Sequence, residues 1–256
     1  MKKILAVIVL SFLIAVPVWA ETFVNGGFEN GDWSGWTTGS GRWYGTPAYP
    51  VAPSYYLPGG GGFDNNVVFN QKSAVVGVGT DAITGLSTVY NGSYAARVNN
   101  YDWDSHVSVI SQTVTNYTDA KIYFAWAAVL EESHGPTDSD YFALTLRDET
   151  DGVDLYSRVY SSGNQQQAGY FNTTNWNWST WYYTQWITEE LDVSNLQGHT
   201  FTLSLLASDC PYTGHGGYVY LDGFGGKPPV QSTPEPLTML LLGLGLAGLA
   251  TLRRKF

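Results

Sequence analysis

Cysteine is almost absent from this chain of 256 residues, which contains only Cys210. An intramolecular disulfide framework is therefore excluded, and an ordinary hydrophobic core has to hold the protein together, with or without a bound metal. The middle of the chain, about 210 residues, is long enough to bury such a core.

Basic residues are also scarce: the chain has 12 Lys and Arg residues against 22 Asp and Glu residues. Five of the basic residues lie in segments 1–20 and 234–256, so the body between these ends has 7 basic against 21 acidic residues, a net charge of about −14. Such a surface cannot neutralise a phosphate backbone, which excludes nucleic acid as a partner. It is better suited to calcium or neutral sugars.

Helical periodicity and catalytic motifs are missing as well. No span between the two ends keeps a helical hydrophobic period for three turns. The chain has no Gly-x-Ser-x-Gly elbow, no His-Glu-x-x-His pair and no phosphate-binding glycine loop. A carboxylate pair for glycoside hydrolysis cannot be chosen from so many acids, because their separation in space decides the chemistry. We therefore predict that the protein is not an enzyme.

Aromatic residues make up 15% of the chain, and there are 29 glycines, a composition that favours strands and turns. Apolar and polar residues alternate over 120–130, 141–148 and 200–207, which predicts half-buried strands. Further strands are predicted at 93–98, 107–114, 153–160, 181–188 and 218–224. Together they predict an all-β jelly-roll sandwich over residues 21–226, with a long irregular insertion at 44–66.

The N-terminal twenty residues have the pattern of a secretory signal peptide. Lys2 and Lys3 precede an apolar run over 4–16, and Val18-Trp19-Ala20 is a small-x-small cleavage site. An uncleaved anchor fits less well, because the run is short and ends at Pro17. We predict a signal peptide over 1–20 and export of the mature chain.

The C-terminal segment 234–256 has three parts: a Pro-Glu-Pro tripeptide, an uncharged run over 237–252 and a basic end. A helix of that run spans about 24 Å, short of the ~30 Å hydrocarbon core, and its basic end stays in the cytoplasm. A plain membrane anchor leaves the helix-breaking tripeptide unexplained. The tripeptide and the basic residues are Pro234, Glu235, Pro236, Arg253, Arg254 and Lys255.

This three-part order resembles the PEP-CTERM sorting signal of Gram-negative bacteria. The resemblance implies recognition by an exosortase and transient anchoring in the inner membrane through a transmembrane helix at 237–252. It further implies removal of the tail and delivery to the cell surface or extracellular matrix, commonly together with exopolysaccharide and biofilm. Residues 227–233 would link the body to this signal.

The body is similar to galactose-binding-like jelly rolls, a group with many carbohydrate-binding modules. The similarity rests on "VNGGFENGDWSGW" (24–36), "NGSYAARVNN" (91–100) and "GYVYLDGF" (217–224). It implies a structural Ca²⁺ shared by Glu29 and Asp222, with Asn25 or nearby carbonyls completing a shell of hard oxygens. Alternatively, Glu29 caps a turn and Asp222 is a solvated acid.

The densest aromatic stretch, "NWNWSTWYYTQW" (175–186), suggests sugar stacking. Trp176 and Trp178 would share one face of an extended segment, and Trp103 would be exposed on a loop. Trp and Tyr rings stack on the apolar faces of sugars, although such rings also fill sandwich cores, as we expect for Trp181 and Trp186.

Two further sets of residues could form catalytic or metal sites, but each also has a simpler structural explanation. Cys210 and His215 suggest a nucleophile and its base, or two zinc ligands to be completed by His106, His134 or His199. We expect instead a loop whose Cys and His pack locally. The Asp-x-Asp pairs at 102–104 and 138–140 do not continue into an EF-hand, and we expect solvated turns there.

The sequence thus predicts an exported, exosortase-processed matrix protein with a non-catalytic carbohydrate-binding-like module that associates with extracellular polysaccharide. The alternative is a structural or adhesive biofilm protein that binds proteins rather than glycans.

Overall fold

The computed structural model describes residues 22–231, and the regular structure in this range consists of twelve strands and four short 3₁₀ turns. The predicted signal peptide and sorting segment lie outside the described residues. Within residues 22–231, no helix is long and apolar enough to cross a membrane.

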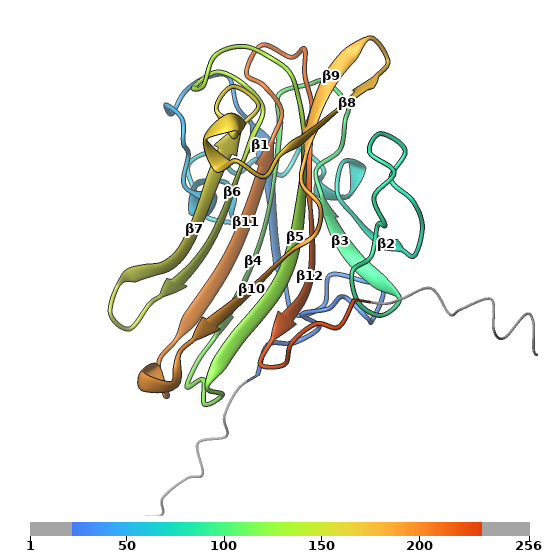
Figure 1. The fold of residues 1–256 in the computed structure, drawn as a ribbon. Coiled ribbons are helices and arrows are strands. Elements are labelled where there is room, and N and C mark those ends of the chain that lie inside the picture. The colour runs from blue at the N-terminus through green and yellow to red at the C-terminus, as the bar shows by residue number, and fades with distance from the viewer. Residues whose placement is uncertain (1–21, 232–256) are drawn as a thin grey trace, which may run out of the picture.

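The strands form two antiparallel sheets packed face to face, so the predicted all-β jelly-roll sandwich is confirmed (Figure 1). Several neighbours in each sheet, such as β4 with β11 and β3 with β12, are distant in sequence, as in jelly rolls, whereas β6–β7 and β8–β9 are consecutive strands. The five-stranded sheet has the order β1 (Thr37–Arg42), β4 (His106–Val114), β11 (Phe201–Ser208), β6 (Tyr141–Asp148) and β7 (Val153–Ser161). The seven-stranded sheet has the order β2 (Ala74–Gly77), β3 (Tyr94–Val98), β12 (Gly217–Gly225), β5 (Lys121–Glu131), β9 (Ser179–Tyr183) and β8 (Asn172–Trp176), and β10 (Ile187–Asp192) also pairs with β5.

The main core lies between the sheets and is formed by the alternating apolar residues that the sequence shows. Phe124 and Trp126 of β5 point inward, and the Trp126 ring lies 5.3 Å from that of Phe142 on β6. Leu203 and Leu205 of β11 complete this layer, and all five side chains are fully buried. Burial of rings and branched chains on facing sheets is the main source of stability in such a sandwich.

Loops cover parts of the outer faces of both sheets, so alternation understates the burial. On the five-stranded sheet, the insertion at 44–66 seals a second cluster around Trp43 and Tyr56. On the seven-stranded sheet, the segment 78–92 packs on β5 and β12 through Ile83 and Leu86. Consequently β5 is buried on both faces from Phe124 onward, and the prediction that it is half-buried is wrong.

Most predicted strands are observed within one or two residues of their expected ends, with two kinds of difference. The strands β1, β2 and β8 have no counterpart in the prediction. The strand predicted at 181–188 is two strands, because the chain leaves regular pairing at 184–186 and returns to β5 in β10.

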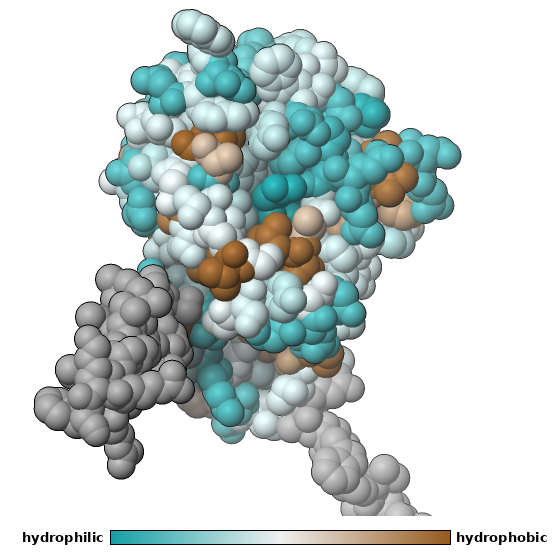
Figure 2. Space-filling view, turned by 90° about the vertical axis from the view of Figure 1, so that its right-hand side faces the viewer, coloured by the Kyte–Doolittle hydropathy of each residue, from teal (hydrophilic) through white to brown (hydrophobic). Residues whose placement is uncertain are grey.

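Different segments of the chain lie at the two ends of the sandwich. At one end the N-terminal segment lies against the end of β12, where Phe224 N donates to Gly26 O at 3.0 Å. At the other end lie the β8–β9 hairpin and the loops 99–105, 132–140 and 209–216, at the top of Figure 1. The side on which β2 and β3 lie, shown in Figure 2, has only small, separate apolar patches among polar surface.

His106, at the start of β4, makes stability depend on pH. Burial lowers the pKa of His106 from 6.5 to about 4; Asp104 opposes this, and Lys72 and Arg42 add to it. The folded protein therefore keeps the imidazole neutral while the unfolded chain takes up a proton, so stability is lost as pH falls from about 6.5 to about 4.

We expect His106→Gln to remove up to about 3 kcal/mol of this acid-induced loss. Urea denaturation of both proteins between pH 4 and pH 7 measures it. Parallel pH profiles for variant and wild type would show that other groups cause the loss.

Candidate functional site

An aromatic hollow of about 320 Å³ opens at the end of the sandwich away from the described chain ends. The 99–105 loop, the end of β5 and the β8–β9 hairpin form its walls. The Tyr101 and Trp176 rings meet edge to face at 5.4 Å, and Trp176 packs at 6.2 Å on the buried ring of Trp181. The lining residues are Tyr101, Asp102, Trp103, Glu131, Trp176, Asn177 and Trp181.

A buried carboxylate fixes the most exposed ring of the hollow. Trp103 is 60% exposed, and its Nε1 donates to Glu131 Oε2 at 2.9 Å. The same oxygen accepts from Gly216 N at 3.1 Å, and Glu131 is 1% exposed. Trp103 thus presents an accessible flat ring whose orientation is fixed by its hydrogen bond to the buried Glu131. A ring that is already oriented loses less side-chain entropy when a ligand stacks on it.

Asp102 gives the rim of the hollow a negative charge. Burial acts to raise the pKa of Asp102, but hydrogen bonds from Asn100 and Lys72 outweigh it and hold the pKa below its usual value. Lys72 Nζ lies 3.1 Å from Asp102 and 3.5 Å from Asp104. This Asp-x-Asp pair is therefore bound to a lysine.

Trp178 does not lie with Trp176 on an extended face, and that part of the prediction is wrong. Asn177 and Trp178 have φ angles of +47° and +70°, and they form the two-residue turn between β8 and β9. Positive φ at both central residues is the type I′ geometry that suits hairpins. Trp178 therefore stands fully exposed at the hairpin tip while Trp176 faces the hollow.

In the second Asp-x-Asp pair, Asp138 lies in a turn, where its Oδ1 accepts from Gly135 N at 2.6 Å, but Asp140 is not solvated, contrary to our expectation. Asp140 is fully buried beneath the hollow, and its carboxylate accepts from Ser162 Oγ at 2.5 Å and from Glu131 N at 3.1 Å. Burial raises the pKa of Asp140 well above its usual value; the Ser162 bond opposes this and the Glu131 charge adds to it. Asp140 positions the backbone at Glu131 rather than meeting solvent.

A larger groove, about 930 Å³, runs over the outer face of the five-stranded sheet. Hydroxyl pairs line it, such as Ser111 with Ser204 at 2.9 Å and Thr113 with Thr202 at 2.8 Å. None of its lining residues is aromatic. Because stacking on sugars needs flat apolar rings, the smaller hollow has the better chemistry for a glycan.

Glu29 and Asp222, 193 positions apart in sequence, bind the same loop at the opposite end. Glu29 accepts from Ser93 N and Tyr94 N at 3.0–3.1 Å. Asp222 Oδ2 accepts from Tyr90 N and Asn91 N at 2.9 and 2.8 Å. A Cβ added at Gly27 would lie 3.7 Å from Asp222 Oδ1 and 3.8 Å from Glu29 Cγ, so both side chains border the space beside this glycine.

Asp222 is the member of this pair that has an unpaired carboxylate oxygen. It is fully buried, and its Oδ1 has no hydrogen-bond partner. Burial raises the pKa of Asp222 to about 7; backbone N–H groups oppose this, and the charge of Glu29 adds to it. An orphaned buried carboxylate oxygen beside a second carboxylate is a donor set that fits Ca²⁺.

Asn25 does not belong to this donor set. Its Nδ2 donates to Asp32 O and Ser34 O, and its Oδ1 accepts from Asn30 N. Its carbonyl accepts from Phe28 N and Trp36 Nε1. The side chain closes the 25–34 turn, so the expectation of Asn25 as a ligand is wrong.

Comparison with known proteins identifies the tail. Residues 232–255 match the family described as "PEP-CTERM protein-sorting motif". The sorting signal expected from Pro234, Glu235, Pro236, Arg253 and Arg254 is thereby confirmed, although these residues lie outside the described structure. No curated protein matches the chain.

Several solved structures of carbohydrate-binding modules are similar to the chain. A complex of TmCBM61 with β-1,4-galactotriose is 15% identical, with 80% of this chain and 97% of that chain covered and a TM-score of 0.41. A CBM28 module specific for non-crystalline cellulose is 12% identical, with coverages of 83% and 96% and a TM-score of 0.37. CBM27-1 of Caldicellulosiruptor saccharolyticus with mannohexaose is 11% identical, with coverages of 64% and 87% and a TM-score of 0.35.

Proposed function

We propose that the body is a non-catalytic glycan-binding module that takes a neutral sugar chain in the hollow at Trp103 and Trp176. The observation that carries this is the exposed Trp103 ring, held by the buried Glu131 carboxylate beside the edge-to-face pair of Tyr101 and Trp176. Rings set at angles suit successive sugar faces, and Asp102 and Asn177 can bond hydroxyls. The net charge of about −14 on the body disfavours anionic sugars.

The proposed scaffold ion is Ca²⁺, held by Glu29 and Asp222. Bound there, it would neutralise two carboxylates that the fold brings together and tie the N-terminal segment to β12. Its contribution would be to stability, because the hollow lies at the other end of the sandwich.

The proposed destination follows from the sorting motif. Export across the inner membrane, transient anchoring through the tail and exosortase processing would deliver the module to the cell surface or matrix of a Gram-negative bacterium. There it would associate with exopolysaccharide in a biofilm.

We expect Trp103→Ala to weaken glycan binding by about 2 kcal/mol, roughly thirtyfold in Kd, because a central, oriented ring is lost. Trp176→Ala should act in the same direction. An array of neutral oligosaccharides, followed by calorimetry of the full chain with its best ligand, measures both effects. Trp178→Ala is the matched control and should leave Kd within a factor of two.

The controls also separate the alternatives. If Trp178→Ala weakens binding and Trp103→Ala does not, the hollow is not the site. If the full chain binds no glycan but associates with itself or with matrix proteins, the adhesive function replaces this proposal. Turnover of a polysaccharide by the purified protein would exclude a purely binding role.

A further inference from the structure

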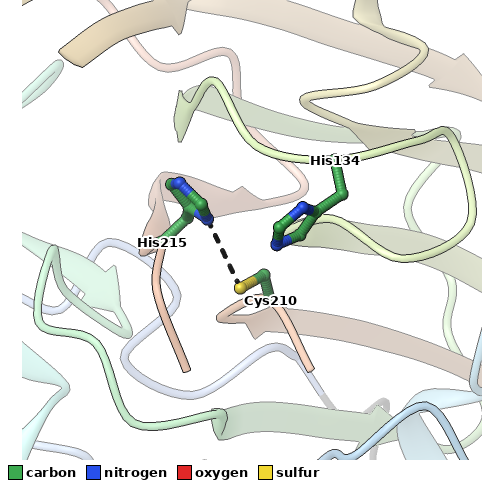
Figure 3. Close-up of side chains that lie close together, drawn as sticks. All are labelled: His134, Cys210 and His215. Carbon is green, nitrogen blue, oxygen red and sulfur yellow. Dashed lines mark hydrogen bonds between the residues drawn. The ribbon is translucent and has the colours of Figure 1, made fainter. Parts of the chain in front are cut away.

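A thiol and two imidazoles lie close together near the hollow, on loops that the fold brings together (Figure 3). His134 follows β5, while Cys210 and His215 lie in the segment that joins β11 to β12. Cys210 Sγ is 3.6 Å from His215 Nδ1. One ligand atom from each residue lies within 4.8 Å of the others, and Cys210 is buried while His134 is exposed.

We propose that His134, Cys210 and His215 form a zinc-binding site with three protein ligands and one open position. A thiolate and two imidazoles are ligands that Zn²⁺ takes, whereas Ca²⁺ and Mg²⁺ require oxygen. The site is therefore chemically distinct from the Glu29–Asp222 pair and lies at the other end of the sandwich.

The geometry needs only a small closure. Zn–S and Zn–N bonds of about 2.3 and 2.0 Å place tetrahedral ligand atoms roughly 3.3–3.6 Å apart. The Cys210–His215 pair already has this separation. The His134 ligand atom lies within 4.8 Å of the other two, so it has to approach by at most about 1.5 Å. Its exposed ring packs edge to face on Tyr212 at 4.9 Å and on His215 at 5.1 Å, and a change of its χ angles would make this approach.

The loop is built to hold the pair together. Cys210 N donates to His215 O at 3.0 Å, and Gly214 N points at Cys210 Sγ at 3.4 Å. This N–H contact fixes the position of the sulfur relative to the loop. Thr213 has φ +64°, a left-handed conformation that is costly for a β-branched residue, and it lets the chain turn back within the five residues after Cys210.

Binding has one visible cost. Ser133 Oγ lies 3.0 Å from His215 Nδ1 and would give up this hydrogen bond to the metal. Such a neutral hydrogen bond contributes far less than a zinc–thiolate site supplies. The open fourth position would take water or a ligand from solvent.

The expectation that Cys210 and His215 merely pack locally is thus replaced by a proposal, and the structure selects His134 as their partner. His199 instead lies at the other end of β11, where its Nδ1 is 2.8 Å from Asp148 Oδ2. His106 is buried on β4.

The test uses the full chain, stripped of metal and titrated with Co²⁺ and then Zn²⁺ in the presence of Ca²⁺. We expect one equivalent of Co²⁺ to give thiolate-to-metal charge-transfer absorption and the strong visible bands of four-coordinate cobalt, both removed by one equivalent of Zn²⁺. Cys210→Ser should abolish the charge-transfer absorption and weaken Zn²⁺ binding at least a hundredfold. His215→Gln should weaken it similarly.

The matched control is His199→Gln, which alters the Asp148–Asp151–His199 cluster and should leave the cobalt spectrum and zinc affinity unchanged. Circular dichroism and thermal melting check that each variant is folded. The proposal is overturned if wild-type protein shows no cobalt–thiolate absorption, which needs no variant. It is also overturned if folded Cys210→Ser keeps its zinc affinity or if His199→Gln abolishes binding.

Discussion

Adding calcium to chelator-treated protein is expected to raise its melting temperature by roughly 10 °C, and Asp222→Asn is expected to abolish the rise. At a thousandfold excess over Kd, an ion that binds only the folded state contributes about 4 kcal/mol. For a domain of this size, each kcal/mol is worth about 2–4 °C. Calcium binding would satisfy Asp222 Oδ1, which is buried without a hydrogen-bond partner.

In calcium, Asp222→Asn should melt below wild type because it loses the ion. Without calcium, the same substitution should not destabilise the protein. The folded pKa of Asp222, about 7, lies above its ordinary value of 3.8. For a carboxyl whose pKa rises on folding, this contribution to stability is present at low pH and is lost as pH rises from about 4 to about 7. At pH 7.5 in chelator, Asp222→Asn should therefore be at least as stable as wild type, and its pH profile should be flatter over this interval.

Thermal scans of wild type and Asp222→Asn, each in chelator and in calcium, measure how the difference between their melting temperatures changes with calcium. The matched control is Asp32→Asn, which removes an exposed carboxylate three residues from Glu29 while keeping the oxygen that Ser34 N and Asn25 Nδ2 bind. It should respond to calcium as wild type does. Equal melting of wild type in calcium and in chelator would count against the site.

Alternation of residues was enough to locate the strands that face the main core. β5, β6 and β11 carry apolar side chains, most of them large, at every second position, and they are observed within a residue of their predicted ends. β1, with sequence "TTGSGR", and β2, with "AVVG", carry no such pattern. They are strands because β4 and β3 offer them backbone partners, which the local sequence does not show.

The aromatic site was predictable in its residue types but not in its geometry. Hairpin turns of type I′ usually contain Asn-Gly, and a Trp at φ +70° gives no sequence signal. The extended reading of 175–178 therefore failed at Trp178. Glu131 was missed because its role depends on Trp103, 28 positions away, and no local pattern marks a buried carboxylate that accepts from an indole.

The cluster of His134, Cys210 and His215 depends on strand register, which the sequence alone does not reveal. The Cys-x₄-His spacing is visible in the sequence, whereas His134 is 76 positions from Cys210. β5 and β12 pair with Leu130 opposite Gly217, so the residues after β5 lie beside those before β12. That pairing, rather than any motif, brings the third ligand to the site.

The contact between the N-terminal segment and β12 has no tolerance for a side chain at Gly26. A Cβ there would lie 1.7 Å from Phe224 O, far inside van der Waals contact, and the obstacle is backbone. Gly26→Ala must therefore separate the two segments. This separation breaks the hydrogen bond from Phe224 N to Gly26 O. It also disrupts the packing of Phe23 on Phe224, whose ring centroids lie 3.8 Å apart. We expect a loss of about 3 kcal/mol in the free energy of unfolding.

The loss should appear in chelator as well as in calcium, because it comes from packing. In calcium the variant should also bind the ion more weakly, since Glu29 belongs to the displaced segment and Asp222 lies two residues before Phe224. Gly225→Ala is the matched control: its added Cβ meets nothing within 4 Å, and its stability should stay within about 0.5 kcal/mol of wild type. Urea denaturation distinguishes the two variants, and equal midpoints would show that the chain ends are not held as tightly as this contact requires.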